Sequence, residues 1–289
     1  MAALARQLVM LSKPRIVAML VFTAVCGAWK AAEGAPEGAV LAAVAGAGAL
    51  AAAGANAINQ GLDADIDAVM SRTRGRPVPS KQMRARIAVV AGAVLVVVAV
   101  ALMWVAANPI AAWLTLAAAL VYVFVYTVAL KRRSWNNIVI GGAAGAFPPL
   151  IGAAAVTGTV EAVGVYMFAF VFFWTPPHFW TLSILLKDDY ASAKVPMLST
   201  VASERATYVQ ILLYVVLLMA MGWLPFASGY GGVTFGAVAT AVGLYWLWKL
   251  RPLSRGPSRT ETLAAYKYSL VYLAVVFLAL AVEPSLPWY

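Results

Sequence analysis

The chain has 289 residues, of which 63% are hydrophobic and 11% are charged, and its formal net charge is +10. Soluble domains are about 45–50% apolar and about 25% charged. This composition, with a mean hydropathy of +0.85, therefore excludes an ordinary soluble protein. A bilayer-spanning helix needs about 20 apolar residues. The sequence predicts nine such helices, over about 14–33, 38–62, 86–106, 109–130, 137–156, 162–186, 207–228, 232–249 and 263–283.

The basic residues gather in alternate connections between these stretches. If the N-terminus is cytoplasmic, all of the 21 lysines and arginines except Lys30 fall on the cytoplasmic side. The positive-inside rule then explains the net charge, and no nucleic acid is expected as a partner. The pattern predicts an integral protein of the cytoplasmic membrane, with its N-terminus inside and its C-terminus outside. The single cysteine, Cys26, excludes an intramolecular disulfide.

The predicted fold class is therefore an all-α polytopic membrane protein with nine transmembrane helices. One transmembrane domain is expected to cover residues 1–289. Acidic clusters follow both the second and the sixth apolar stretch. This spacing indicates two weakly similar halves, about 10–130 and 131–249, plus a last helix over 263–283.

Polar residues at the end of the second stretch carry the strongest functional signal. In a helix, steps of four residues turn by about 400°, so Asn59, Asp63 and Asp67 share one face, whereas Asp65 points nearly the opposite way. Amide and carboxylate oxygens are hard ligands that suit Mg²⁺, which also takes phosphate oxygens. This face predicts half of a magnesium site that awaits an anionic ligand.

Basic residues follow this face at once and add donors for phosphate. Arg72 and Arg76 carry planar, permanently charged guanidinium groups, which bind phosphate oxygens well. Lys131, at the end of the fourth stretch, is a third candidate. Metal-binding acids beside phosphate-binding cations predict a site for a Mg²⁺–diphosphate.

The same segment resembles a known signature. The pattern N-x3-D-x3-D-x4-R-T-x2-R-P over residues 59–77 is similar to the first aspartate-rich motif of the UbiA superfamily of intramembrane prenyltransferases. This resemblance implies a helical bundle with a central cavity that opens to the cytoplasmic side. It also implies that a prenyl diphosphate binds there through Mg²⁺.

A second informative segment is TPPHFWTLSILLKDDYASAKVPML, residues 175–198. Pro176 and Pro177 predict a break or kink near the middle of the sixth helix. Asp189 takes the place of the closing aspartate in the superfamily's second motif, D-x3-D, and the resemblance makes it a fourth Mg²⁺ ligand. The opening aspartate of that motif is replaced by Leu185.

The pattern H-F-W-x8-D-Y-x2-A-x2-P-M-L over 178–198 is similar to the haem O synthases (protohaem IX farnesyltransferases) of the superfamily. The segments 11–16 and 126–152 resemble the same group. The resemblance implies transfer of a farnesyl group from farnesyl diphosphate to a vinyl group of haem B, giving haem O. Mg²⁺ would assist ionisation of the diphosphate, and haem B would be a substrate rather than a permanent cofactor. A homo-oligomer, or association with a downstream haem-modifying enzyme, is compatible with this reading.

Three aromatic side chains admit two interpretations each. His178, the only histidine in the chain, is either a hydrogen-bonded packing residue or a group that contacts the haem substrate. Tyr122 and Tyr126 lie four residues apart and share a helix face. They either pack between helices or form an electron-rich wall beside a carbocation.

Two other functions remain open at the level of sequence. One is a quinone-precursor or other aromatic prenyltransferase of the same superfamily. The other, from a different class, is a secondary transporter, because broken helices and paired acidic edges also suit ion coupling. The acids lie at a predicted membrane boundary, whereas coupling sites usually lie near the midplane.

Overall fold

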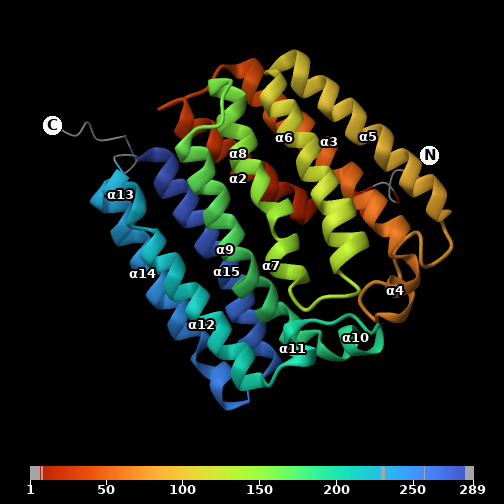
Figure 1. Cartoon of the computed structure of the whole chain (residues 1–289). Coiled ribbons are helices and arrows are strands. Elements are labelled where there is room, and N and C mark those ends of the chain that lie inside the picture. The colour runs from red at the N-terminus through yellow and green to blue at the C-terminus, as the bar shows by residue number, and fades with distance from the viewer. Residues whose placement is uncertain (1–6, 8, 229–231, 257, 284–289) are drawn as a thin grey trace.

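The computed structural model describes residues 7, 9–228, 232–256 and 258–283 (Figure 1). Within this part of the chain, nine helices are long and apolar enough to cross a membrane, and no strand occurs. The prediction of an all-α integral membrane protein with nine spans is confirmed. The division into two similar halves stays a prediction. Arg6, one of the basic residues expected on the cytoplasmic side, lies outside the described residues.

The spans follow one another along the chain, and short helices lie between some of them. The spanning elements are α2 (Pro14–Ala31), α3 (Gly38–Leu62), α5 (Ala85–Ala106), α6 (Pro109–Leu120) continued by η1 (Val121–Leu130), α7 (Asn137–Gly141) with α8 (Ala143–Thr157), α9 (Ala162–Leu185), α12 (Glu204–Met221), α14 (Val233–Leu250) and α15 (Arg259–Val282). The shorter elements are α4 (Ala64–Val69), α10 (Lys187–Ser192), α11 (Leu198–Val201), α13 (Leu224–Ser228) and η2 (Arg251–Arg255).

Polar caps explain where two helices begin earlier than their apolar stretches predict. Ser203 accepts a hydrogen bond from the backbone N–H of Ala206 at 3.1 Å, so α12 begins at Glu204. Ser258 and Glu261 form a capping box at the start of α15. Such caps satisfy backbone donors that hydropathy does not register, so a helix extends past its apolar stretch.

Small residues allow the close approach of helices that a membrane protein needs in the absence of a strong hydrophobic driving force. A Cβ added at Gly54 in α3 would lie 2.6 Å from the carbonyl oxygen of Gly92 in α5. On α8, a Cβ at Gly152 would lie 1.9 Å from the carbonyl oxygen of Ala24 in α2. The α3–α5 and α2–α8 contacts are therefore backbone to backbone.

The sequence predicts a break or a kink at Pro176 and Pro177; the break is wrong, because α9 continues through both residues, and a kink stays a prediction. Threonine hydroxyls take up carbonyl groups on either side: Thr175 donates to Val171 O at 2.9 Å, and Thr181 donates to Pro177 O at 2.7 Å. The carbonyl groups that the prolines free are those of Phe172 and Phe173; transmembrane helices tolerate proline because neighbouring helices and local adjustments can satisfy such groups.

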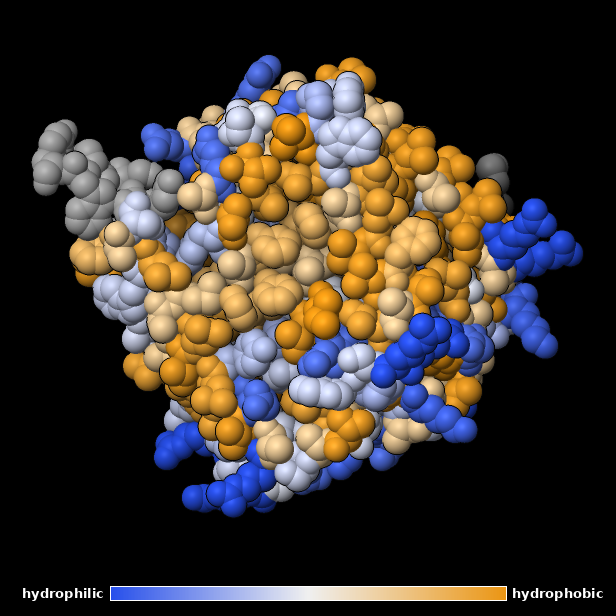
Figure 2. Space-filling view, viewed as in Figure 1, coloured by the Kyte–Doolittle hydropathy of each residue, from blue (hydrophilic) through white to orange (hydrophobic). Residues whose placement is uncertain are grey.

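Polar connections meet at one end of the bundle, which carries α4, α10 and α11 in Figure 1. Lys131 forms an ion pair with Asp63, and the backbone N–H of Ser71 donates to Asp189 at 3.0 Å. Figure 2 shows hydrophilic side chains mainly toward this end and apolar ones over the helix faces. The polar residues of three separate connections are thus gathered at one membrane boundary.

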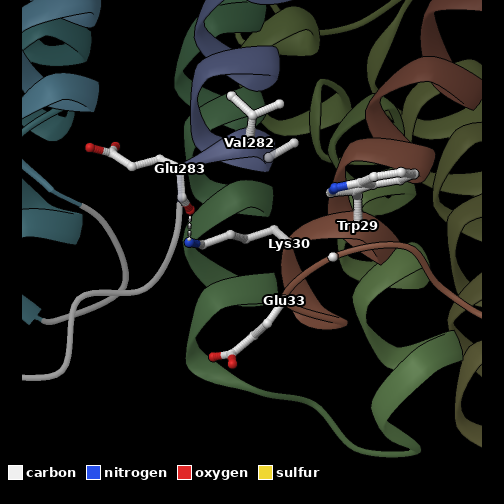
Figure 3. Close-up of a pocket in the computed structure, with 7 residues that line it drawn as sticks. Trp29, Lys30, Glu33, Val282 and Glu283 are labelled. Atoms are coloured by element: carbon white, nitrogen blue, oxygen red, sulfur yellow. Dashed lines mark hydrogen bonds between the residues drawn. The ribbon is translucent and has the colours of Figure 1, made fainter.

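The opposite end is closed by a contact between the first and last spans. Lys30, at the end of α2, is 4% exposed, and its Nζ donates to the carbonyl oxygen of Glu283 at 2.8 Å (Figure 3). The carboxylate of Glu283 in turn accepts from the backbone N–H of Phe235 at 3.0 Å. Lys30, the one basic residue outside the predicted cytoplasmic set, therefore ties α2 to α15.

Candidate active site

Asn59, Asp63 and Asp67 lie together at the junction of α3 and α4, and their side chains are 3%, 1% and 2% exposed. Asp63 leaves helical geometry, with φ −96° and ψ 12°, so the helix is not continuous there. The backbone bonds from Asp63 N to Asn59 O and from Asp67 N to Asp63 O preserve the four-residue register across the junction. Asn59 Nδ2 donates to Asp63 Oδ2 at 2.7 Å.

Asp65 lies outside this group, as the helical-face argument predicts. Its side chain is 65% exposed and pairs with Arg132 at 2.7 Å. The hydrogen bond from Arg132 is the main cause that lowers the pKa of Asp65 below its ordinary value. The structure thus separates two buried carboxylates from a solvated one within five residues of chain.

Two of the predicted phosphate-binding cations reach the buried acids. Lys131 donates to Asp63 Oδ2, and its side chain is 11% exposed. Arg76 Nη1 lies 2.6 Å from Asp67 Oδ2. Each buried carboxylate therefore has its own cation, which compensates part of the cost of burying charge.

Lys13 also reaches this group, and the sequence analysis treated it only as a topology charge. Its Nζ donates to Asn59 Oδ1 at 3.1 Å and to the Tyr122 hydroxyl at 3.3 Å. Burial, helped by the charges of Arg76 and Lys131, lowers the pKa of Lys13 to about 7. Its backbone has φ 53°, a left-handed conformation that costs about 1–3 kcal/mol in a non-glycine residue. The only signal for this role in the sequence was the position of the lysine, directly before Pro14, where the hydropathy begins to rise.

Asp189 and Arg72 meet at the rim and not within the buried group. The Asp189 carboxylate accepts from the backbone N–H groups of Ser71 and Arg72, at 3.0 and 3.4 Å. Burial raises the pKa of Asp189, but these hydrogen bonds outweigh it, so the pKa lies below its ordinary value. In the described part of the chain the Arg72 guanidinium makes no hydrogen bond or ion pair. The predicted roles of both residues stay predictions.

Tyr122 and Tyr126 stack on each other, with ring centroids 5.6 Å apart and an angle of 16°. They lie on η1, which is a π-helix, whereas a regular α-helix was expected. A π-helix shifts register and is frequent at functional sites. Gly141 makes room for this arrangement, because a Cβ there would lie 2.4 Å from Cδ2 of Tyr126. The shared face is confirmed, and the role of the two rings stays a prediction.

His178 lies on α9 against α15, apart from the acidic group. Its Nδ1 is 2.6 Å from Oγ of Ser269. Its ring stacks between Trp174 and Tyr266, at centroid distances of 4.2 and 4.8 Å. The structure therefore shows the contacts of the packing interpretation directly, and a contact with the haem substrate stays a prediction.

The buried group fits a divalent cation by its oxygen donors. Asp63 Oδ1 is buried without a hydrogen bond, and Arg132 Nη2 lies 3.6 Å from it. With Asn59 and Asp67 it offers the hard oxygen ligands that Mg²⁺ prefers. Among the residues that the structure describes, no three acidic, histidine or cysteine side chains form a metal-binding cluster. Asn59, Asp63 and Asp67 would supply at most three ligands to such an ion, and water or phosphate oxygens would suit the remaining positions.

Known proteins extend these observations. The chain is 46% identical over 278 residues to a Thermus thermophilus protein named protoheme IX farnesyltransferase; this match covers 96% of the chain and 46% of that protein. The chain thus spans about half the length of that relative. A Granulibacter bethesdensis protein with the same name is 46% identical over 284 residues, which cover 95% of the chain and 89% of that protein.

The fold has close neighbours among solved structures. A UbiA homologue from Archaeoglobus fulgidus, bound to GPP and Mg²⁺, superposes with a TM-score of 0.72 at 15% identity and covers 95% of this chain and 99% of that one. At this identity the likeness concerns the fold alone. The model of the UbiA prenyltransferase family matches residues 20–282. The motif resemblance found in the sequence is thereby confirmed, and the chain belongs to the UbiA prenyltransferase family.

Proposed function

We propose that the protein transfers a farnesyl group from farnesyl diphosphate to a vinyl group of haem B, which gives haem O. The observation that carries the proposal is the buried pair Asp63 and Asp67, each held by its own cation beside Asn59. The two relatives named protoheme IX farnesyltransferase support the choice of donor and acceptor.

Asn59, Asp63 and Asp67 would hold Mg²⁺, with Asp189 as a further candidate from the rim. The Archaeoglobus fulgidus homologue, which is bound to GPP and Mg²⁺, supports this pairing of metal and diphosphate. When bound, the metal would neutralise charge on the leaving diphosphate. The hydrogen-bond-free Oδ1 of Asp63 is the atom best prepared for it.

The basic side chains would bind and orient the diphosphate. Lys131 and Arg76 already converge on the two carboxylates, and Arg72 stands at the rim without an ion pair in the described part of the chain. As the allylic C–O bond breaks, its electron pair stays with the diphosphate oxygen. Preorganised cations at that oxygen stabilise the developing charge.

The stacked Tyr122 and Tyr126 would face the allylic cation. Aromatic ring faces attract cations through their quadrupole, and they exclude water that would hydrolyse the cation. The cation then bonds to the terminal carbon of the vinyl group. Water adds to the resulting cation and loses a proton, which leaves a hydroxyethylfarnesyl side chain.

His178 would contact the haem acceptor from α9. We place the reaction at the cytoplasmic face of the cytoplasmic membrane, with the N-terminus inside and the C-terminus outside, because of the basic residues in alternate connections. A homo-oligomer or a haem-modifying partner enzyme would fit a product that stays in the bilayer.

The test is an assay with the purified full chain in lipid nanodiscs, supplied with haem B, 4-hydroxybenzoate, farnesyl diphosphate and Mg²⁺. Mass analysis of extracted haem should show a gain of one farnesyl group plus one hydroxyl group. Unmodified haem together with prenylated 4-hydroxybenzoate would favour the aromatic prenyltransferase. Failure to modify either acceptor would contradict the proposal.

A further inference from the structure

A short hydrogen-bond chain on α15 fixes the chemical state of the His178 ring. The Ser269 hydroxyl donates to the carbonyl oxygen of Tyr266 at 2.5 Å. The hydroxyl oxygen of Ser269 also lies 2.6 Å from His178 Nδ1. A hydroxyl has one hydrogen, and here the carbonyl takes it. If the hydroxyl hydrogen stays on that carbonyl, the bond to Nδ1 runs from Nδ1–H to Ser269 Oγ; the 2.6 Å distance by itself is compatible with either direction. This tautomer leaves a lone pair on Nε2.

Aromatic side chains fix the plane of the same ring. Trp174 lies at 4.2 Å with an interplanar angle of 19°, and Tyr266 lies at 4.8 Å with an angle of 29°. Trp174 is itself anchored, because its Nε1 donates to the carbonyl oxygen of Ser269 at 3.0 Å. Both faces of the imidazole are covered, so only an edge is left to approach.

Nε2 lies on that open edge. His178 is half-buried, and the described part of the chain offers no hydrogen bond to Nε2. Some polar atoms of the described residues are both fully buried and without a hydrogen bond, and Nε2 is not one of them. A packing histidine in a membrane would use both nitrogens, since an unsatisfied one is costly there. The lone pair of Nε2 points along the ring plane, which is the direction of a metal–imidazole bond.

His178 lies on the helix that leads to the rim of the candidate diphosphate site. His178 is seven residues from the end of α9, about 10 Å at 1.5 Å per residue. Phe179 packs on Tyr190 with ring centroids 6.4 Å apart, next to the motif that contains Asp189. The last two turns of α9 therefore connect His178 to the rim of that site.

From this geometry we propose that Ser269 is a positioning residue that holds His178 with Nε2 free, so that Nε2 binds the iron of the haem acceptor. The inference rests on the proposed function for the identity of the acceptor. A hydrogen-bond acceptor on the distal imidazole nitrogen commonly fixes the tautomer and orientation of a metal-binding histidine, and its loss costs about 10–100-fold in metal affinity. Ser269 is fully buried and belongs to the last span, which carries none of the sequence motifs.

The first measurement uses the fact that the chain has one histidine. The full-length protein in nanodiscs, labelled with ¹⁵N-histidine, gives one imidazole whose two nitrogen shifts report the tautomer. We expect a protonated Nδ1 and an unprotonated Nε2 at neutral pH. The opposite tautomer, or a rapid mixture of both, would overturn the inference without any substitution.

The second measurement titrates ferric haem B by absorbance and by electron paramagnetic resonance. Ser269→Ala should weaken haem binding by about 10–100-fold and change the axial-ligand spectrum, and Ser269→Thr, which keeps the hydroxyl, should restore both. His178→Ala should lose the histidine-type spectrum, and added imidazole should return it. Unchanged affinity and spectrum in Ser269→Ala would overturn the inference.

Ser183→Ala is the matched control. Ser183 is also fully buried on a span and donates to the carbonyl three residues earlier, at Trp180, but it has no imidazole partner. It should leave the haem spectrum unchanged. If the wild-type protein shows haem spectra that depend on His178 but no farnesyl transfer, the proposed function is contradicted and this inference is not. If it transfers the farnesyl group without such spectra, this inference is contradicted and the proposed function is not.

Discussion

Lys13 Nζ lies 3.1 Å from Oδ1 of Asn59, although 46 residues separate the two along the chain. This contact brings a cation from the start of α2 to the candidate magnesium face. It also directs the amide of Asn59, so that its Nδ2 turns to Asp63 at 2.7 Å. A lysine that holds an oxygen ligand in place is expected to act on diphosphate binding.

Lys13→Ala should therefore raise the KM for farnesyl diphosphate by about 10–100-fold, the equivalent of about 1.5–3 kcal/mol for a hydrogen bond to a charged group. Lys13→Arg should retain part of the affinity. Steady-state kinetics in nanodiscs measures both. Arg15→Ala, which changes an exposed residue two positions away, is the control. Equal losses for Lys13→Ala and Arg15→Ala would contradict a specific role.

The acidic face was predictable from sequence because its residues are local. Asn59, Asp63 and Asp67 are spaced by four, and the backbone keeps that register across the α3–α4 junction. Lys13 was missed because its partner is 46 residues away. No periodicity encodes a contact of that separation.

The second half of the site was less predictable for a similar reason. Asp189 accepts from backbone N–H groups more than 100 residues earlier, at Ser71 and Arg72, and backbone groups carry no sequence signal. The two prolines of α9 misled, because proline lowers helix propensity but membrane packing restores the helix. Nine spans were recoverable because hydropathy is a property of each segment by itself.

Neutralising the buried acids should abolish transfer. In Asp63→Asn or Asp67→Asn one charged ligand disappears, while Lys131 or Arg76 loses its partner. Breaking a buried ion pair costs about 3–5 kcal/mol, so thermal unfolding should be measured together with activity. Asp65→Asn removes only an exposed pair and should keep most of both. Similar losses in all three variants would refute the separation of the two faces.

Metal removal should stop the reaction reversibly. The candidate ligands are all oxygen atoms, and one of them, Asp63 Oδ1, is buried without a hydrogen bond. A chelator should abolish turnover, and Mg²⁺ should restore it. Ca²⁺ should restore it poorly, since it prefers more ligands at longer distances. Full activity in excess chelator would exclude a metal-dependent site.

Membrane orientation can be tested with single cysteines in a Cys26→Ala background, since Cys26 is the only cysteine. Ser80 is exposed in the connection after α4, and Thr159 is exposed in the connection after α8. In intact cells an impermeant maleimide should label Thr159→Cys and spare Ser80→Cys. Lysis should allow both to react. Labelling of Ser80→Cys in intact cells would reverse the proposed orientation.

The stacked tyrosines can be displaced without touching them. A Cβ at Gly141 would lie 2.4 Å from Cδ2 of Tyr126, whereas a Cβ at Gly145, one helical turn later, meets nothing within 4 Å. Gly141→Ala must push the Tyr126 ring away from Tyr122, so the aromatic wall loses its geometry. If the rings shield an allylic cation, this variant should lower kcat and increase hydrolysis of farnesyl diphosphate to farnesol, because water reaches the cation.

Gly145→Ala should leave the ratio of transfer to hydrolysis unchanged. Tyr126→Phe, which keeps the ring face and removes only the hydroxyl, should also keep that ratio. A reduced kcat in Gly141→Ala with no added farnesol would show that the two tyrosines act in packing alone, and the cation would then need another wall.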